Sequence, residues 1–316
     1  MSPATFRRIT LTVLVTQVLI VLTGAAVRLT GSGLGCSNWP NCTEERLVAP
    51  TEYHALIEFV NRLVSFPVLA AVLVALWAAR RRDPYRRELV VITGVILGGV
   101  VAQVLVGAVV VWLHLLPSTV IVHFLVSMGL LLASVALHHR AGLYLPGAAG
   151  ASSSASGPGA WPADLSTPFA HLLVLGATVV LVTGTVVTGS GPHGGDENAE
   201  RLGFFLPTAT RTHSVAVWVF LAVLVATLLV LRSERAPRPL LSAGTMILGV
   251  SLAQGAIGYL QYWNGVPELL VFLHIIGAMA VWGTTVWFWL EHRRLAGVGP
   301  AVADVASRPE PARGVA

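Results

Sequence analysis

The chain contains no lysine, so all 20 of its basic residues are arginine. Charged residues make up only 11% of its 316 positions, and 55% are hydrophobic. Because soluble domains usually carry about 25% charged residues, this composition excludes a soluble globular protein and indicates a multi-span membrane protein. The net charge of +5 does not point to nucleic-acid binding, because the arginines are distributed as membrane topology requires.

Cysteine is nearly absent as well. The only two, Cys36 and Cys42, lie close together in a segment that follows the first apolar run. On the oxidising side of a membrane such a pair is expected to form a disulfide. The bond would act either as a structural staple for this loop or as a redox-active pair, and the residues leave both interpretations open.

Long apolar runs are what the sequence has in abundance. A transmembrane helix needs about 20 mostly apolar residues, and the first such run lacks the small-residue cleavage site of a signal peptide. The sequence therefore predicts an all-α membrane protein with eight transmembrane helices, the first one retained. The expected helices cover approximately 9–27, 57–79, 89–113, 117–137, 168–189, 212–231, 240–262 and 267–290.

The placement of arginine predicts how these helices are oriented. Arginines precede the first helix and follow the second, fourth, sixth and eighth, so they fall on one side of the membrane. Positively charged loops mark the cytoplasmic side, which places both termini of this multi-pass cell-membrane protein in the cytoplasm. The long loops 28–56 and 190–210, and most of the loop acids, then lie outside.

A segment rich in Gly, Ala, Ser and Pro, 145–163, predicts a flexible cytoplasmic linker between two four-helix halves. We expect an N-terminal half over 1–144, a C-terminal half over 164–294 and a disordered cytoplasmic tail over 295–316. Four helices in each half give the two halves the same orientation. They are therefore predicted to be parallel-repeat four-helix bundles, related by an axis along the membrane normal.

An internal repeat supports this division. His123 recurs as His274, and Thr23-Gly24 near the end of the first helix recurs as Thr183-Gly184 in the fifth. The first match extends over Leu97, Gly98, Ala102, Gln103, Gly107 and Trp112, all of which recur 151 positions later. The repeat thus places a metal-ligating side chain inside an apolar segment, where ionisable residues are costly and functional by default.

His213 gives His274 a partner. His213 lies near the outer end of the sixth helix and His274 about seven residues into the eighth, so both face one outer-leaflet cavity if these helices are neighbours. Two imidazoles on facing helices of a bundle can hold a haem iron axially. Imidazole also suits Cu, Ni and Zn, but the apolar surroundings favour haem. The alternative, a histidine that only packs between helices, fits a lone histidine better than a repeated one.

The first half is not a clean copy of the second. Glu58, Asn61 and Arg62 are spaced at i, i+3 and i+4 and therefore share one helix face. Either Glu58 and Arg62 form an ion pair that lowers the cost of burying them, or Arg62 holds a carboxylate, such as a haem propionate, while Glu58 serves a reacting group. His54, one turn before Glu58, would join them or lie in the loop.

The remaining histidines rank lower. His138, His139 and His292 lie beside arginines at the cytoplasmic helix ends, where we expect them at the membrane interface. His193 lies in a loop that could cover the second site. No Cys-x-x-Cys-His sequence occurs, so covalent attachment of a c-type haem is not indicated.

Taken together, these motifs resemble the haem A synthase family. The first outer loop carries the most specific part, Arg28-Leu29-Thr30-Gly31-Ser32-Gly33-Leu34-Gly35-Cys36 with Trp39-Pro40 and Cys42. The remaining matches are Glu58 with Arg62, Gly191-Pro192-His193 with Asp196, and the three histidines His123, His213 and His274. The resemblance covers about residues 9–290 and follows the order of all eight helices.

The resemblance implies an oxidoreductase that converts haem O to haem A for terminal oxidases. The C8 methyl group of the ring is oxidised to a formyl group through a hydroxymethyl stage. In the family the C-terminal half holds a haem b by two histidines, which correspond to His213 and His274. The N-terminal half receives haem O, with His123 as its ligand and Glu58 as the catalytic residue. The implied partners are a haem O synthase, an electron donor such as a quinol, and membrane lipid; a homo-oligomer is left open.

The sequence departs from the family in two places. The usual Glu-x-x-His-Arg reads Glu58-Phe59-Val60-Asn61-Arg62, so one expected axial histidine is Asn61. His123 would then hold the substrate haem alone and leave an open iron position, or His54 would substitute as a ligand. The third outer loop also lacks the second cysteine pair that some members carry.

Two other functions compete with this prediction. A quinol-linked di-haem b electron-transfer protein should keep two equivalent histidine pairs, which the asymmetry at Asn61 opposes. A haem transporter should open to both sides of the membrane, whereas the candidate groups all lie towards the outer leaflet.

Overall fold

The protein is described by a computed structural model that covers residues 1–143, 161 and 163–297. The described residues contain eight α-helices and no strand. All eight are long and apolar enough to cross a membrane, which confirms the predicted helix number and the all-α class. Most of the expected linker, 145–163, and the tail from residue 298 lie outside the described residues.

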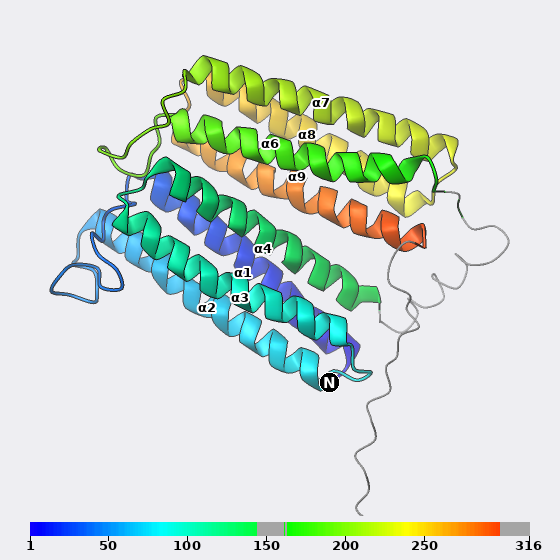
Figure 1. Cartoon of the computed structure of the whole chain (residues 1–316), viewed down its shortest axis with the longest axis horizontal. Helices are drawn as coiled ribbons and strands as arrows, with labels where there is room; N and C mark the ends of the chain where they lie inside the picture. The colour runs from blue at the N-terminus through cyan, green and yellow to red at the C-terminus, as the bar shows by residue number, and fades with distance from the viewer. Residues whose placement is uncertain (144–160, 162, 298–316) are drawn as a thin grey trace, which may run out of the picture.

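The helices follow one another in a simple order (Figure 1). They are α1 (Pro3–Leu29), α2 (Tyr53–Arg81), α3 (Arg87–Trp112), α4 (Pro117–Leu143), α6 (Ser166–Ser190), α7 (Leu206–Ser233), α8 (Arg238–Trp263) and α9 (Glu268–Leu295). Several begin one or two turns before the apolar run that predicted them, because a helix continues into the polar membrane boundary where its backbone hydrogen bonds are still needed.

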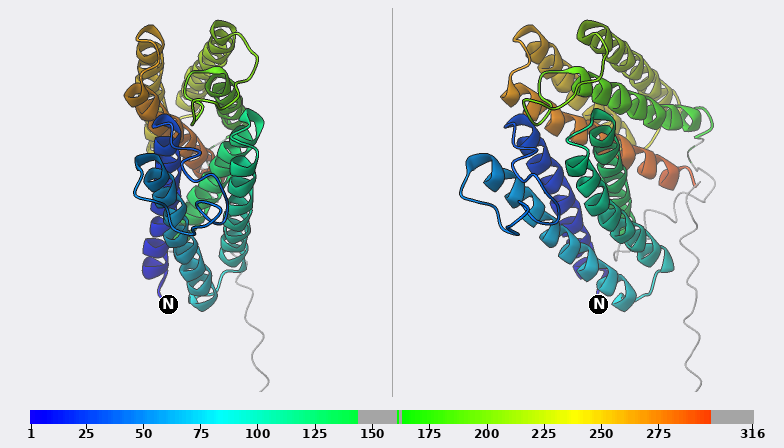
Figure 2. Two further views of the ribbon diagram at one scale, coloured as in Figure 1. Left: turned by 90° about the vertical axis from the view of Figure 1, so that its left-hand side faces the viewer. Right: turned by 60° about the vertical axis from the view of Figure 1, so that its left-hand side comes forward.

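The eight helices form two groups of four that lie side by side (Figures 1 and 2). In the first group α1 contacts α2 and α4, while α3 contacts the same two helices. The second group repeats this pattern, because α6 contacts α7 and α9, and α8 contacts the same two. Between the groups α4 packs on α9, α1 on α9 and α4 on α6. Each helix contact in one group therefore has a counterpart in the other.

The two ends of this bundle differ. One end carries the long connections 30–52 and 191–205, at the left of Figure 1, and we name it the loop end. The other end carries Met1, the end of α9 and the arginines that follow α2, and we name it the arginine end. Both described termini thus lie at the same end of the bundle.

Apolar side chains fill both groups, and the core of the second continues across the junction to Met128 and Leu131 of α4. Phe6, Val72 and Ile96 are buried in the first, and Leu173, Leu224 and Phe288 in the second. Large side chains on the outside are apolar too, and Leu105 and Leu229 are each 59% exposed. An apolar outer surface is what lipid requires.

Polar contacts tie the two groups together. Midway along the helices the Trp282 Nε1–H of α9 donates to the Met128 carbonyl of α4 over 2.9 Å. At the arginine end His139 Nε2 lies 2.9 Å from Glu291 Oε2. His139 and His292 lie near the ends of α4 and α9, where the sequence placed them, and are only 4% and 1% exposed. They pack between helices, and each finds a polar partner there.

Replacement of Trp282 by Phe tests this junction. Phenylalanine keeps one aromatic ring, but the donor to the Met128 carbonyl and part of the buried packing are lost, which should cost about 2 kcal/mol of stability. Thermal unfolding of the full chain in one detergent measures the change. Trp263→Phe is the matched control, because Trp263 is 73% exposed. An equal effect of the two substitutions would contradict a stabilising role for the junction.

Candidate functional site

His213 is positioned by two residues of the neighbouring helix. Its Nδ1 lies 3.0 Å from the Thr183 hydroxyl of α6. The next residue, Gly184, lies against the ring, because a Cβ there would approach His213 Cε1 to 3.2 Å. The Thr-Gly pair thus offers a polar partner to one ring nitrogen and room for the rest of the ring. A hydrogen bond at one nitrogen fixes the tautomer and orientation of a ligand histidine.

His274 is held in a similar way between α8 and α9. A Cβ at Gly258 would lie 3.1 Å from His274 Cε1, so the absence of a side chain makes room for the ring. Gln254 Nε2 donates to the His274 carbonyl over 2.6 Å. The His274 Nδ1 is buried and has no hydrogen-bond partner among the described residues. A buried nitrogen without a partner is rare and calls for a functional explanation.

The structure brings His213 and His274 together across the interior of the second group. Their ring centres are 6.4 Å apart and their planes are inclined by 78°. With a metal–nitrogen bond of about 2 Å and roughly 1 Å more to the ring centre, two rings on opposite sides of one ion have centres about 6 Å apart. The observed spacing therefore fits two imidazoles that share one metal ion.

The donor set narrows the choice of that ion. Among the described residues no group of three or more His, Cys, Asp or Glu side chains could hold a metal. Two imidazoles alone suit an iron whose other ligands come from a porphyrin, as in proteins that bind haem. The residues of this site thus fit a haem held by His213 and His274.

The first group repeats these helix contacts with one change. Thr23 Oγ1 of α1 donates to Asn61 Oδ1 of α2 over 2.7 Å, and Gly24 lies beside the same amide. This contact corresponds to that of Thr183 and Gly184 with His213. Asn61 therefore keeps the contact between the helices but supplies no imidazole.

His123 is placed in the first group much as His274 is in the second. Gln103 Nε2 donates to the His123 carbonyl over 2.9 Å, and Gly107 leaves room for the ring. The His123 Nδ1 is buried without a hydrogen-bond partner among the described residues. No hydrogen bond among the described residues joins His123 to Asn61 or Glu58, which lie on α2. The two sites are thus alike on α4 and α9 and differ on α2 and α7.

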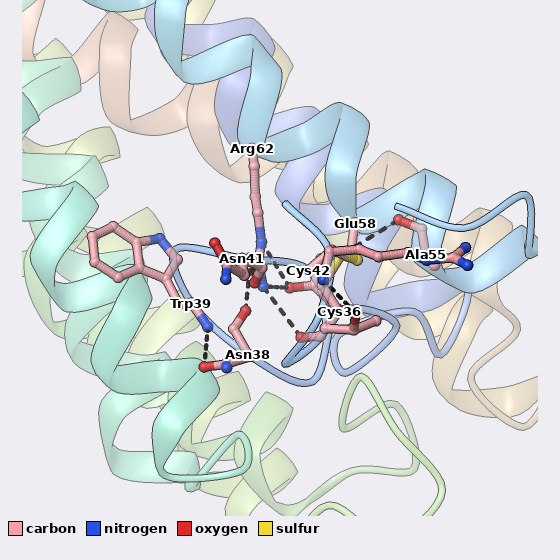
Figure 3. Close-up of a disulfide and its surroundings, with 10 residues drawn as sticks. Cys36, Asn38, Trp39, Asn41, Cys42, Ala55, Glu58 and Arg62 are labelled. Atoms are coloured by element: carbon pink, nitrogen blue, oxygen red, sulfur yellow. Dashed lines mark hydrogen bonds and ion pairs between the residues drawn. A yellow bond between two sulfur atoms is a disulfide. The ribbon is translucent and has the colours of Figure 1, made fainter. Parts of the chain in front are cut away.

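Glu58 and Arg62 form an ion pair, one of the two interpretations that their spacing allowed, with Arg62 Nη2 2.5 Å from Glu58 Oε1. Glu58 is 4% exposed, and its Oε2 accepts the Cys36 amide over 2.7 Å. Arg62 also donates to the carbonyls of Cys36, Asn38 and Asn41 (Figure 3). The pair therefore holds the cysteine loop against the start of α2.

The expected disulfide between Cys36 and Cys42 is present, and both residues are fully buried. At the rim of the same loop Trp39 packs edge-on against Trp112 of α3, with ring centres 5.9 Å apart. His54 lies in the first turn of α2 and its Nδ1 is 2.9 Å from the Ser32 hydroxyl. His54 thus contacts the loop, and none of its described hydrogen bonds reaches Glu58.

Sequence reasoning had assigned no role to the residues that surround the histidines. Thr183, Gly184, Gln254 and Gly258 hold or make room for the two rings. Each of these residues belongs to the internal repeat, and the repeat was the signal that could have identified them. A Thr-Gly or Gln-x-x-x-Gly pattern that recurs together with the histidines implies packing against the histidine rings.

These features define a multi-span helical membrane protein with a histidine pair in one half and an altered copy of that site in the other. A model of the cytochrome oxidase assembly protein family (COX15-CtaA) matches residues 7–193, which is more than half of the chain. The chain therefore belongs to this family of haem A synthases.

Several curated relatives are similar over part of their length. The heme A synthase of Geobacillus thermodenitrificans is 34% identical over 105 residues, 33% of this chain and 32% of the relative. That of Lysinibacillus sphaericus is 37% identical over 93 residues, 29% of this chain and 30% of the relative. The chain thus matches about a third of the length of each of these relatives.

Replacement of Arg62 by Lys should loosen the cysteine loop. Lysine keeps the charge but cannot donate at once to Glu58 and three carbonyls. We expect the Cys36 amide to exchange its hydrogen roughly ten-fold faster, the effect of losing about one hydrogen bond. Hydrogen-exchange mass spectrometry of the loop peptide measures this rate. Arg46→Lys, at an exposed position of the same loop, is the control; unchanged exchange in Arg62→Lys would refute the clamp.

Proposed function

We propose that this protein is a haem A synthase, which oxidises the C8 methyl group of haem O to a formyl group through a hydroxymethyl stage. Family membership supports this activity. The observation that carries it is the break in the repeat: the Thr-Gly contact that orients His213 in one half orients Asn61 in the other. An electron-transfer protein with two equivalent haems would have no use for this asymmetry.

His213 and His274 would hold haem b, and His123 would hold haem O in the first half. Haem supplies the oxidation–reduction chemistry, and the protein supplies placement and electrostatics. With Asn61 opposite, His123 is the one imidazole offered to the substrate haem from these two helices. His54 is a less favoured second ligand, because its Nδ1 is bonded to Ser32 at the loop end.

Glu58 is the proposed catalytic residue. Its Oε1 is occupied by Arg62, but Oε2 accepts only the Cys36 amide and retains capacity for another donor. A buried carboxyl in this position would move protons or stabilise a positively charged intermediate while haem supplies the oxidation–reduction chemistry. Arg62 belongs to the substrate site by fixing Glu58 and the loop. With its donors engaged there, Arg62 is poorly placed to hold a propionate as well.

The arrangement in the membrane follows from the charges. We propose that the arginine end faces the cytoplasm, with both termini, and that the loop end and both haem sites lie towards the outer leaflet. The matched helix contacts support two parallel repeats related by an axis along the membrane normal. The proposed units are an N-terminal half over 1–144, a C-terminal half over 164–294, and the linker and tail between and after them.

The proposed partners are an enzyme that supplies haem O and a donor of electrons such as a quinol. A protein of Thermus thermophilus named protoheme IX farnesyltransferase is 43% identical to this chain over 70 residues, 22% of this chain and 12% of that protein. A stretch of this kind in a protein that modifies haem supports a role for the present chain in the same series of reactions.

Haem composition tests the activity. Co-expression with a haem O synthase, in a host that lacks haem A, should yield haem A in the extracted haems. Haems B and O alone, with the chain folded, would refute the synthase proposal. Glu58→Gln should abolish haem A and leave haem b bound, whereas His274→Ala should remove haem b. Glu52→Gln, exposed just before α2, is the control for Glu58 and should keep full activity.

The packing of Gly258 against His274 offers a second test. Gly258→Ala would bring a methyl group to 3.1 Å of His274 Cε1 and force the ring to move. We expect a several-fold loss of bound haem b, measured as haem per protein after purification. Gly249→Ala is the matched control on the same helix, because a Cβ there meets nothing within 4 Å. Equal haem content in the two variants would contradict this ligand assignment.

A further inference from the structure

A segment of the second half reaches across the junction between the halves. The connection 191–205, named the strap here, joins α6 to α7 at the loop end. Its Gly195 carbonyl accepts the Gly33 amide of the first half over 2.7 Å. Its His193 Nε2 lies 2.7 Å from the Val266 carbonyl, in the turn just before α9. The strap thus touches the starts of both helices that carry the histidine pair.

One arginine from outside the strap and one within it bind the strap backbone. Arg28, at the end of α1, donates its Nε–H to the His193 carbonyl over 2.7 Å and an Nη2–H to the Thr188 carbonyl over 3.0 Å. Arg201, itself a strap residue, donates to the Pro192 carbonyl over 2.6 Å and to the carbonyls of its neighbours Ala199 and Glu200. Because the carbonyls of Pro192 and His193 belong to consecutive residues, the two guanidinium groups meet the same short stretch of backbone.

Among the described residues, no ion pair joins either of these arginines to a carboxylate. One histidine of the strap is near a carboxylate, because His193 Nδ1 lies 3.9 Å from Glu268 Oε1. Arg28 and Arg201 bind the carbonyls of neighbouring residues, so their positive charges lie close together. Two adjacent guanidinium groups that bind only carbonyl oxygens leave two positive charges without a neutralising negative charge at a membrane boundary. A dianionic group would balance these charges.

Arg28 lies one helical turn beyond the His213 ring along α6, on the side of the loop end. The His213 ring rests on Gly184, and Arg28 bonds the carbonyl of Thr188, one helical turn further along α6. At 1.5 Å per residue this step is about 6 Å towards the loop end, which is comparable to the distance from the centre of a porphyrin to its rim. A ligand centred between His213 and His274 would therefore present its edge to these arginines.

We propose that Arg28 and Arg201 bind the two propionate carboxylates of the haem held by His213 and His274. This inference rests on the proposed function, which places haem b at that pair. Two guanidinium groups match two carboxylates in charge, and arginine is well suited to carboxylate recognition because of its planar donors. Arg28 belongs to the first half, so the haem of the second half is held in part by a residue from outside its own bundle.

Haem with blocked carboxylates tests the proposal. The full-length chain, prepared without haem in detergent, is titrated with iron protoporphyrin IX and with its dimethyl ester, which keeps the iron and the ring. The unaltered chain should bind the free acid at least ten-fold more tightly, the effect of about one charge-assisted hydrogen bond. In Arg28→Gln and Arg201→Gln this preference should shrink, and in the double variant it should vanish, while affinity for the ester stays the same.

The controls separate charge recognition from loss of the strap. Arg28→Lys should restore part of the preference because it keeps the charge, and Arg46→Gln, an exposed arginine of the other long loop, should change nothing. An equal loss of affinity for acid and ester would show a structural role and overturn the proposal. Unchanged haem binding with less co-purified anionic lipid would show that the arginines hold a lipid headgroup instead.

The same titration distinguishes a failure of the haem b assignment from a failure of the propionate proposal. If the unaltered chain binds neither form, or if His274→Ala binds both as tightly as before, the assignment of haem b to the histidine pair has failed. The reduction midpoint of the bound haem gives an independent reading. It should fall in Arg28→Gln and Arg201→Gln, because an unbalanced propionate charge favours the oxidised iron.

Discussion

The absence of water from the hydrocarbon layer is the constraint on which the rest of this structure depends. A polar side chain there must find its partner on a neighbouring helix or on the backbone. Gln103 and Gln254 donate to the carbonyls of His123 and His274, and the Glu58 carboxylate is met by an arginine and an amide. The two glutamine contacts join neighbouring helices at a defined height, and the Glu58 contacts join α2 to the cysteine loop. The few polar residues therefore set the register of the bundle, while the apolar ones fill it.

This constraint explains how the repeat could diverge without losing its packing. In the first half Asn61 accepts a hydrogen bond from Thr23. In the second half His213 lies within hydrogen-bond distance of the equivalent residue, Thr183. The amide and the imidazole make the same contact between helices. The exchange therefore keeps this contact and replaces an imidazole, a potential metal ligand, by an amide. A single residue, Asn61, thus keeps the helix contact but changes the side chain offered to a ligand. It lies one turn from Glu58 on the same helix face.

Features with a local cause could be predicted from the sequence. Eight apolar runs implied eight helices, and the close spacing of Cys36 and Cys42 implied their bond. Partners distant in the chain could not be predicted, because helix packing decides them. The place of His139 beside Arg140 did not reveal its buried contact with Glu291, 152 positions away. For Arg62, the i,i+4 spacing indicated the contact with Glu58. It could not indicate the hydrogen bonds from Arg62 to the carbonyls of the cysteine loop, because these depend on how the loop folds back onto α2.

Arg28 shows why one copy of a repeated element can serve both halves. Counted from the shared Thr-Gly pair, its counterpart in α6 is Thr188, and Arg28 donates to the carbonyl of that very residue. This hydrogen bond thus joins α1 and α6 at positions that correspond in the repeat. A second arginine in place of Thr188 would add another positive charge beside Arg28 and Arg201, whose charges already lie close together. Arg28 alone, supplied by the first half, avoids the repulsion that a further arginine would add. It still donates to the strap through the His193 carbonyl.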